Sequence, residues 1–407
     1  MPTVTLSHNI RALYAFSFLK MTLFPMAIIT LFWKDHIGLS LTEILLIQGL
    51  FSLATLLFEY PSGYLSDLLG YRLCLNMAAI LGIVGWGVYL KADSFGTVLL
   101  AELILGASFA FISGSDSALL YETLDSEDRA HRYSQFEGRM LGLAQTGEAV
   151  GALFAGTLYA FFPLLPFIIQ VAIWVLILLL TFSMREPERT RAPHGGSHLT
   201  QAWSTIRHAL KENRRLRAAL LFSVFLGLAS FYPVWLIQPF MQETGVPLTW
   251  FGPIWAGANL TVAIFSWLSH RVAFVLGTRM MAITLVGLVL AGYLGLALTA
   301  ASLSFLFYYL LTSMRGLQGP MLKNCIQLQS RSGNRASIMS IKSFLFRFFF
   351  FCTGPLAGMA ADRWGLNAAF LILGVAMMLV LVPAMILFIQ STNEETTGII
   401  SEREPSR

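Results

Sequence analysis

The chain has 407 residues, of which 56% are hydrophobic and only 12% carry a charged side chain. Soluble globular domains carry roughly 25% charged residues, so this composition argues against a cytosolic enzyme, a nucleic-acid binder and a disordered scaffold. The three cysteines are far apart and lie in or beside apolar runs, without any Cys/His cluster. We therefore predict neither a disulfide framework nor a metal site.

Twelve apolar runs follow one another along the chain, each long enough for a membrane-spanning helix, which needs roughly 20 residues. The predicted spans are residues 10–33, 41–66, 72–92, 96–121, 134–160, 162–184, 217–241, 248–269, 279–298, 300–323, 336–361 and 367–390. No small-residue cleavage site follows the first run, so we expect a retained helix and not a removed signal peptide. The sequence therefore predicts an all-α membrane protein with twelve transmembrane helices.

The 27 Lys and Arg residues are distributed unevenly between the two sides that these spans define. With the amino terminus inside, 19 lie in the predicted inner segments and three in the outer loops, at Lys34, Lys91 and Arg363. Cytoplasmic loops carry an excess of Lys and Arg, and such residues attract anionic lipid headgroups. We therefore expect a multi-pass protein of the inner (plasma) membrane with both termini in the cytoplasm. The same bias explains most of the net charge of +5, which does not indicate nucleic acid.

One long polar segment, residues 185–216, separates the sixth and seventh spans. Its first part is rich in Pro, Gly and Arg, and its second part, LTQAWSTIRHALKENRRLR, has a more helical sequence. We predict a cytoplasmic linker with a short surface helix. The linker would divide the chain into two six-helix bundles, residues 1–184 and 217–390, and a cytoplasmic tail would follow at 391–407.

The two halves share a weak internal repeat. At an offset of 203, Gly151 falls on Gly354. Earlier in each half, a Gly-x-Arg follows a span at corresponding places: Gly70-Tyr-Arg72 and Gly277-Thr-Arg279. These matches predict two pseudo-symmetric bundles, and internal repeats of this kind are typical of secondary transporters.

The segment between the second and third spans reads Gly63-Tyr-Leu-Ser-Asp67-Leu-Leu-Gly70-Tyr-Arg72. It is similar to the loop motif G-x-L-a-D-x-x-G-r-R/K of the major facilitator superfamily (MFS), and the resemblance covers nearly the whole chain through its twelve spans, 6+6 halves and central linker. The resemblance implies the MFS fold and a secondary active transporter whose two halves rock about a site near the membrane midplane. The segments SGSDSALLYETL and EGRMLGLAQTGEAVGAL resemble poorly characterised prokaryotic efflux members of the superfamily.

The same resemblance implies a conformational gate at the inner ends of the helices. In that family Asp67 and Arg72 would belong to a charge network near the amino end of the eleventh span, where a carboxylate meets the positive end of the helix dipole. This network would stabilise the outward-open state. The residues assigned to the gate are Gly63, Asp67, Gly70, Arg72, Lys342, Glu137 and Arg139.

Two positions depart from the motifs of drug–proton antiporters in this superfamily. The fourth span has no Arg and carries Glu102, and the fifth span has Glu148 where the motif G-P-x-x-G-G has Pro. Both departures argue against the drug-exporter subfamily. We expect Glu102, near the outer end of its span, to reach water.

Ionisable side chains inside a membrane span are costly, so they are usually paired or face a cavity. The residues that we predict to bind the solute are Lys20, Asp116, Arg315, Arg347 and Asn259. Asp116 and Glu148 are the candidate proton carriers, because a desolvated carboxylate can cycle its proton near neutral pH. Structural alternatives stay open: Lys20 can form an ion pair with Asp116 or Glu148, and Asp116 can cap an unwound turn.

The cations among these residues, Lys20, Arg315 and Arg347, favour an anionic or zwitterionic small organic solute. We predict transport by alternating access, with proton-coupled export favoured and a proton-coupled importer of an organic anion or nutrient as the alternative. A candidate of another class is a membrane receptor or scaffold that does not transport. Because no nucleophile motif or Walker loop occurs, we predict no catalytic activity and no cofactor. The expected partners of a monomer are the solute, protons and membrane lipids.

Overall fold

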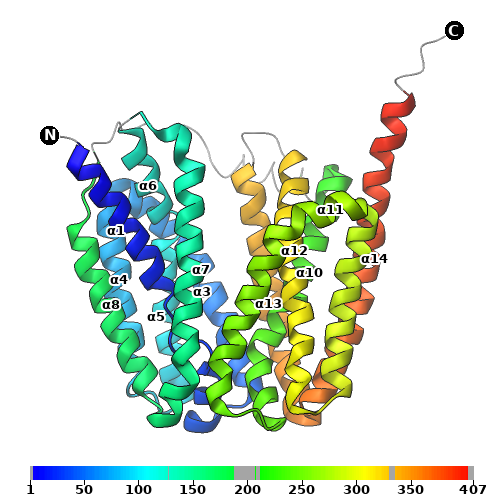
Figure 1. Ribbon diagram of the computed structural model, residues 1–407, viewed down its shortest axis with the longest axis horizontal. Helices are drawn as coiled ribbons and strands as arrows, with labels where there is room; N and C mark the ends of the chain where they lie inside the picture. Colours follow the sequence, from blue (N-terminus) through cyan, green and yellow to red (C-terminus); the bar gives the residue numbers. More distant parts are fainter. Residues whose placement is uncertain (1–2, 127, 188–206, 208–210, 330–334, 402–407) are drawn as a thin grey trace. The chain divides into compact units, whose positions relative to one another are not determined.

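The computed structural model of the chain describes residues 3–126, 128–187, 207, 211–329 and 335–401. Every regular element in these ranges is a helix (Figure 1). The elements of the first half are α1 (Thr3–Met21), α2 (Ile29–Leu31), η1 (Phe32–Ile37), α3 (Leu41–Leu69), α4 (Tyr71–Tyr89), α5 (Phe95–Ile112), α6 (Ser115–Asp125), η2 (Ala130–Arg132), α7 (Tyr133–Phe161) and α8 (Leu165–Ser183). The elements of the second half are α10 (Arg214–Glu243), α11 (Leu248–Leu298), η4 (Ser302–Phe305), α12 (Leu306–Leu328), α13 (Arg335–Trp364) and α14 (Leu366–Ser401).

The prediction of an all-α membrane protein is confirmed by the length and hydropathy of these helices. Within the described ranges, eight helices are long and apolar enough to cross a membrane. The predicted number of twelve is higher for two reasons. The helices α1, α7 and α12 do not meet this criterion, and α11 contains two of the predicted spans, which are joined through a kink at Gly277.

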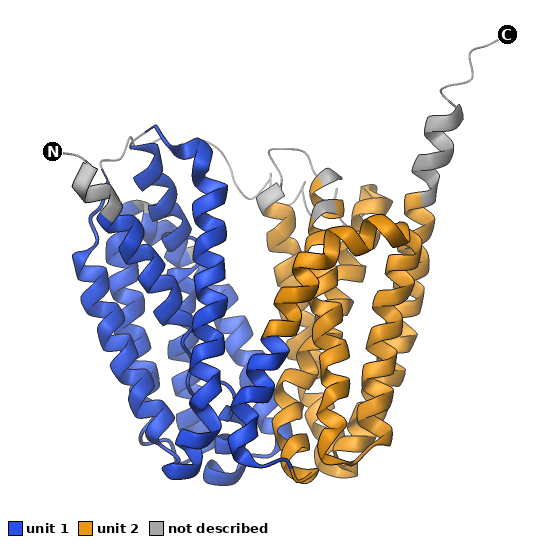
Figure 2. Cartoon of the chain, viewed as in Figure 1, with its two compact units in different colours: residues 1–193, 246–259 blue, residues 194–245, 260–407 orange. Residues whose placement is uncertain are grey.

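The helices form two compact units (Figure 2). Unit 1 comprises residues 1–193 and 246–259, and unit 2 comprises residues 194–245 and 260–407. The predicted boundaries of the two bundles, the linker and the tail stay a prediction. The surface helix that we predict in the linker falls largely on residues 188–206 and 208–210, which lie outside the described residues.

The core of unit 1 depends on close helix packing at small residues. The indole of Trp174 on α8 is fully buried and lies against Gly82 on α4. A Cβ atom at Gly82 would come within 2.0 Å of the indole ring, so only glycine fits there. The α4 helix also packs on α5, where the buried Ser108 hydroxyl donates a 2.7 Å hydrogen bond to the Ala78 carbonyl. In unit 2, α10 is buried along most of its length and packs on α12, α13 and α14.

The internal repeat has a structural counterpart in a pair of serine hydrogen bonds, one in each unit. In unit 1, the hydroxyl of Ser62 on α3 donates to the Ala110 carbonyl on α5 at 2.9 Å. In unit 2, the hydroxyl of Ser269 on α11 donates to the Leu317 carbonyl on α12 at 2.7 Å. Donor and acceptor are 48 residues apart in both cases. Each unit therefore joins corresponding helices with the same bond, as a duplicated bundle would.

The two Gly-x-Arg segments of the repeat also have related backbones. Gly70, between α3 and α4, has φ 106° and ψ 151°, and Gly277, inside α11, has φ 68° and ψ 169°. Residues other than glycine rarely adopt positive φ. At Gly277 this conformation interrupts the helix that contains the eighth and ninth predicted spans, so the chain turns at the same motif in both halves.

Candidate functional site

The first predicted span is interrupted in the structure, which corrects the expectation of one helix over residues 10–33. The α1 helix ends at Met21, and the chain becomes helical again only at Ile29. Pro25 lies in the break and has no N–H to donate to a helix. The Phe24 N–H instead donates to Oε1 of Gln170, a fully buried residue of α8, at 3.0 Å. The break is thus held by a specific polar contact.

Helix α7 approaches this break at two glycines. A Cβ atom at Gly147 would lie 2.2 Å from the Phe18 carbonyl oxygen, and one at Gly151 would lie 2.7 Å from the Leu23 nitrogen. These contacts require glycine at both positions. The glycine-rich stretch of the fifth predicted span therefore permits close helix packing, here against the end of α1.

The fourth predicted span is also interrupted, which corrects the expectation of one helix over residues 96–121. Helix α5 ends at Ile112 and α6 begins at Ser115, with Gly114 at φ 84° between them. A positive φ is readily adopted only by glycine. The break places Asp116 in the first turn of α6, where its Oδ1 accepts a 2.8 Å hydrogen bond from the Ser117 N–H. Asp116 thus lies at an unwound turn, one of the two structural alternatives for this residue.

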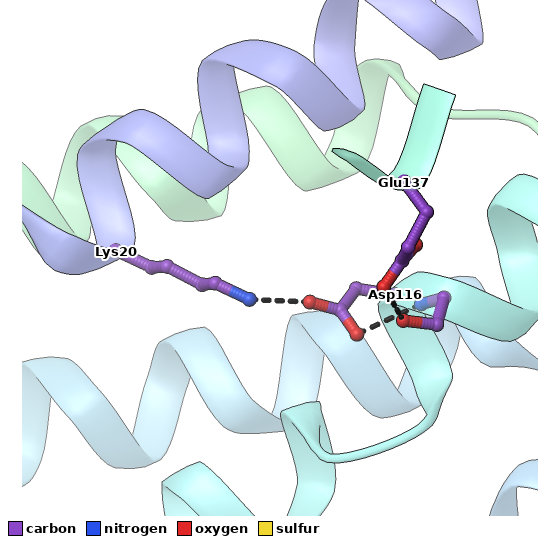
Figure 3. A network of polar contacts seen from close by, with 4 residues as sticks. Lys20, Asp116 and Glu137 are labelled. Atoms are coloured by element: carbon purple, nitrogen blue, oxygen red, sulfur yellow. Dashed lines mark hydrogen bonds and ion pairs between the residues drawn. The ribbon is translucent and has the colours of Figure 1, made fainter. Parts of the chain in front are cut away.

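Lys20 and Asp116 form an ion pair through the Lys20 Nζ and the Asp116 Oδ2 (Figure 3). Their side chains are 17% and 10% exposed, so the pair is mostly buried. Lys20 lies in the last turn of α1 and Asp116 in the first turn of α6. A cation at the carboxyl end of a helix and an anion at an amino end are both stabilised by the helix dipoles. Two helix ends and two opposite charges therefore meet at one point of unit 1.

Glu137 extends this polar cluster toward α7. Its Oε1 accepts a 2.9 Å hydrogen bond from the hydroxyl of Ser117, the residue next to Asp116 (Figure 3). We assigned Glu137 to the gate together with Arg139, but the two side chains have different surroundings. Arg139 is exposed, and its guanidinium lies 5.8 Å from the centre of the Phe136 ring. The polar cluster of Lys20, Asp116, Ser117 and Glu137 is referred to below as the α1–α6 cluster.

The second predicted proton carrier, Glu148, lies outside this cluster: among the described residues, Lys20 pairs with Asp116 and not with Glu148. Its Oε1 accepts a 2.9 Å hydrogen bond from Nδ2 of Asn259. Both residues belong to unit 1, because the unit includes the amino-terminal part of α11. The structure thus joins a predicted proton carrier to a predicted solute-binding residue.

The predicted gate motif contains a helix cap that sequence reasoning missed. The carboxylate of Glu186 accepts the N–H groups of Tyr71 at 2.9 Å and Arg72 at 2.8 Å, at the start of α4. Gly70 allows this approach, since a Cβ atom there would lie 3.1 Å from the same carboxylate. The Arg72 guanidinium donates to the Phe182 carbonyl at 2.9 Å. Glu186 therefore caps the amino terminus of α4, a contact separate from the network predicted between Asp67 and the eleventh span.

Among the described contacts, three other predicted gate residues take no part in the cap of α4. Gly63 is exposed on α3, and the Asp67 side chain lies outside the described residues. Lys342 is half-buried on α13 in unit 2. The charge network between Asp67, Arg72 and the eleventh span therefore stays a prediction.

Two further predicted solute-binding cations lie in unit 2. Arg315 on α12 is half-buried and donates from Nε to the Ser230 hydroxyl at 3.1 Å and from a terminal nitrogen to the Ser230 carbonyl at 2.5 Å. Both acceptors are uncharged, and no carboxylate of a described residue pairs with this guanidinium. Arg347 on α13 donates to the Ser343 hydroxyl at 3.2 Å. An arginine stays charged at any working pH, so the Ser230 contact leaves the positive charge of Arg315 available to an anion.

Glu102 is the residue whose surroundings differ most from the sequence expectation. We expected it to reach water, but it is only 5% exposed and is bonded to side chains of α3 and α4. The signal that could have found this cluster was the presence of Gln48 and Tyr89 in the two spans that precede it. Neither is charged, so a search for ionic partners passed over them.

A family model of the Major Facilitator Superfamily matches residues 12–348. The chain belongs to the Major Facilitator Superfamily. This membership makes it an integral multi-pass membrane transporter and not an enzyme, as the composition and the predicted spans indicated.

Individual MFS proteins resemble the chain over most of its length. The uncharacterized MFS-type transporter YxaM of Bacillus subtilis (strain 168) is 25% identical over 268 residues, which cover 63% of this chain and 65% of that protein. The match thus spans less than two thirds of the relative's length. The crystal structure of the nucleoside transporter NupG has a TM-score of 0.77 at 13% identity, with 93% of this chain and 99% of that chain covered.

A second solved structure is a bacterial homolog of the human lysosomal transporter Spinster, in an inward-facing and unoccupied conformation. Its TM-score is 0.72 at 16% identity, with 96% of this chain and 97% of that chain covered. At these identities the likeness shows the MFS fold alone.

Proposed function

We propose that this MFS transporter exports a small zwitterionic organic solute in exchange for protons, and that the α1–α6 cluster is its coupling site. The observation that carries the proposal is the Lys20–Asp116 ion pair, located where α1 ends and α6 begins. Discontinuous helices in transporters bring helix ends and unpaired backbone groups to a solute near the membrane midplane. A mostly buried ion pair at two such ends combines a cation and an anion that a solute can engage.

A zwitterion fits this pair because it can replace both partners at once. The carboxylate of the solute would bind the Lys20 ammonium, and its amine would bind the Asp116 carboxylate. Neither buried charge is then left without a counterion, which would be strongly unfavourable for a single unpaired charge. A purely cationic solute would leave Lys20 without an anion.

Proton exchange follows from competition at Asp116. When Asp116 takes up a proton, it can no longer hold the amine of a zwitterion as an ion pair. Binding of a proton and binding of the solute therefore oppose each other, and by linkage each lowers the affinity for the other. Opposed binding at one site is the condition for exchange, and a proton gradient directed inward would drive the solute outward. Glu148, bonded to Asn259, is the second candidate for the proton-carrying carboxylate.

The alternative is co-transport of an organic anion with a proton, which would make the chain an importer. The same ion pair supports it in one respect: protonation of Asp116 would release Lys20 to bind an anion, so that proton and anion would favour each other. In unit 2, Arg315 is a separate cation whose described partners are uncharged. The two functions therefore predict opposite effects of pH on solute affinity.

The test measures solute binding and its pH dependence on the purified full-length chain. A thermal-shift screen of zwitterionic, anionic and cationic organic compounds identifies a ligand by the stabilisation that it produces. For exchange, the affinity of the ligand should fall as pH is lowered, and an imposed inward proton gradient should drive the ligand out of proteoliposomes. For co-transport, the affinity should rise as pH is lowered.

Two variants connect these effects to the cluster. Asp116→Asn should abolish the pH dependence and the pH-driven flux, and Asp125→Asn is the matched control, since Asp125 is exposed at the other end of α6. Full pH-driven transport by Asp116→Asn would overturn the assignment of the proton to Asp116. If Glu148→Gln alone lost the coupling, the proton would be assigned to Glu148. Absence of proton-driven flux with every ligand that binds would overturn the proposed exchange.

A further inference from the structure

Glu102 is a buried carboxyl group that the transport proposal does not use. It lies on α5, within the apolar segment Phe95–Asp125, and is 5% exposed. The hydroxyl of Tyr89 on α4 donates to its Oε1 at 2.5 Å, and Nε2 of Gln48 on α3 donates to its Oε2 at 2.8 Å. Tyr89 is fully buried and Gln48 is 3% exposed. The carboxyl group thus links three helices through two uncharged donors.

No cation compensates this carboxyl group among the described residues. On α3, the ionisable residue closest to Gln48 in the sequence is Glu43, whose carboxylate is engaged by the Ser40 N–H and hydroxyl at the start of the helix. On α4, Arg72 lies at the opposite end from Tyr89 and donates to the Phe182 carbonyl. On α6, Asp116 is paired with Lys20.

The remaining neighbouring elements add no buried charge. In η1, the Lys34 ammonium and the Asp35 carboxylate are 4.0 Å apart, with side chains 32% and 39% exposed, and His36 is exposed. Between Leu165 and Ser183, α8 carries no ionisable side chain. An ionised Glu102 would therefore be a buried anion without a counterion inside the membrane, which is a strongly unfavourable arrangement.

The neutral acid can keep the Gln48 bond and reverse the Tyr89 bond, which leaves the Tyr89 O–H to another acceptor. A protonated carboxyl group has one O–H donor and keeps an acceptor oxygen, and a phenol can either donate or accept. Protonated Glu102 can donate to the Tyr89 oxygen while its other oxygen still accepts from Gln48. The two donors therefore tolerate both protonation states, but burial and the absence of a cation favour the neutral one.

We propose that Glu102 is a proton-binding site, occupied at neutral pH, at which the neutral acid joins α3, α4 and α5 through Gln48 and Tyr89. This site is separate from the Lys20–Asp116 pair and goes beyond the proposed function, because no solute takes part in it. Loss of the proton would leave an anion between the three helices and loosen their contact. The ligand of this site is the proton itself.

Infrared spectroscopy tests the proposal directly. The full-length chain is purified in lipid at pH 7 without solute, and the carbonyl band of protonated carboxyl groups is compared between the wild type and Glu102→Gln. The Gln side chain can donate to Tyr89 and accept from Gln48, so this variant keeps the packing. The wild type should show a band component that Glu102→Gln lacks. Asp93→Asn, at an exposed acid before α5, should retain that component. Identical wild-type and Glu102→Gln spectra would overturn the proposal.

A second measurement compares the pH dependence of unfolding. The native state would hold a proton that the unfolded chain releases above the ordinary titration range of Glu, so the wild type should lose stability as pH rises through neutrality. The unfolding equilibrium should change up to tenfold per pH unit, because one proton is involved. Glu102→Gln should lack this component, and an unchanged pH profile in the variant would contradict the proposal. Neither measurement uses transport, so failure of the proposed function would leave the result intact.

Discussion

Lys20 and Asp116, 96 residues apart in the sequence, meet because each lies at the broken end of a helix. The break after Met21 exposes the carboxyl end of α1, and the break at Gly114 exposes the amino end of α6. Continuous helices at both places would remove the favourable dipole at each charge. The ion pair therefore depends on two helix breaks, and neither break is itself formed by a charged residue.

Removal of one partner of this pair should destabilise the protein more than removal of both. Lys20→Met leaves the Asp116 carboxylate without its cation, which should lower the free energy of unfolding by on the order of 3 kcal/mol. Lys20→Met combined with Asp116→Leu should recover most of this loss, because apolar pairs often replace buried ion pairs well. Transport should be lost in both variants. Unfolding midpoints and solute flux measure the two effects, with Lys91→Met, at an exposed lysine, as the control. Retained transport in the double variant would show that the pair is only structural.

The conformation of Gly114 should be necessary for the position of Asp116. Gly114→Ala places a Cβ atom at φ 84°, which should cost about 1–3 kcal/mol of stability and weaken coupled transport. Gly142→Ala is the control, because Gly142 is an exposed helical residue of α7 with open space around it. That change should be neutral or should stabilise by up to about 1 kcal/mol. Equal effects of the two substitutions on the unfolding midpoint would contradict the argument.

Gln170 should stabilise the break in the first span. Gln170→Leu keeps a similar volume but leaves the Phe24 N–H without its acceptor, so we expect a loss of about 1–3 kcal/mol. The same substitution at the exposed Gln145 on α7 should have little effect. Chemical denaturation in detergent measures both. A Gln170→Leu variant as stable as the wild type would show that the break does not need this contact.

Glu186 should act as the cap of α4. Glu186→Ala removes the acceptor of the Tyr71 and Arg72 N–H groups and should cost about 1 kcal/mol. Glu186→Gln, which keeps one acceptor oxygen, should cost less. Gly70→Ala should be worse than either, because it adds positive-φ strain to a close contact with the carboxylate. The order of the three unfolding midpoints checks this prediction. A lower midpoint for Glu186→Ala than for Gly70→Ala would contradict it.

The sequence predicted the helical class and the positions of most helices well. Apolar runs of the required length are a strong signal, and α3, α4, α7 and α8 begin and end within a few residues of the predicted spans. The two breaks were missed because a hydropathy count depends on side-chain polarity and contains no information on backbone conformation. Pro25 and Gly114 were visible local signals of interruption, since both residue types disfavour a continuous helix.

The candidate site was predicted only in part, because its contacts join distant segments. The pairing of Lys20 with Asp116 was one of two options, and Glu148 bonds to Asn259 instead of to Lys20. The Glu102 cluster was missed because its partners are 54 and 13 residues away and are uncharged, so a search for ionic pairs did not find them. Candidate partners of an ion pair can be recognised in a sequence by their opposite charges. Uncharged side chains that donate hydrogen bonds to a carboxyl group cannot be recognised in this way.

The serine hydrogen bonds of the two units leave the amino-acid sequence of the accepting helices free to differ between the halves. In each unit a buried serine hydroxyl donates to a backbone carbonyl, and every residue type supplies such an acceptor. The helix that accepts the bond is therefore free to change its side chains without loss of the contact. Helix α12, for example, can carry Arg315 while the Ser269 bond that joins it to α11 stays the same.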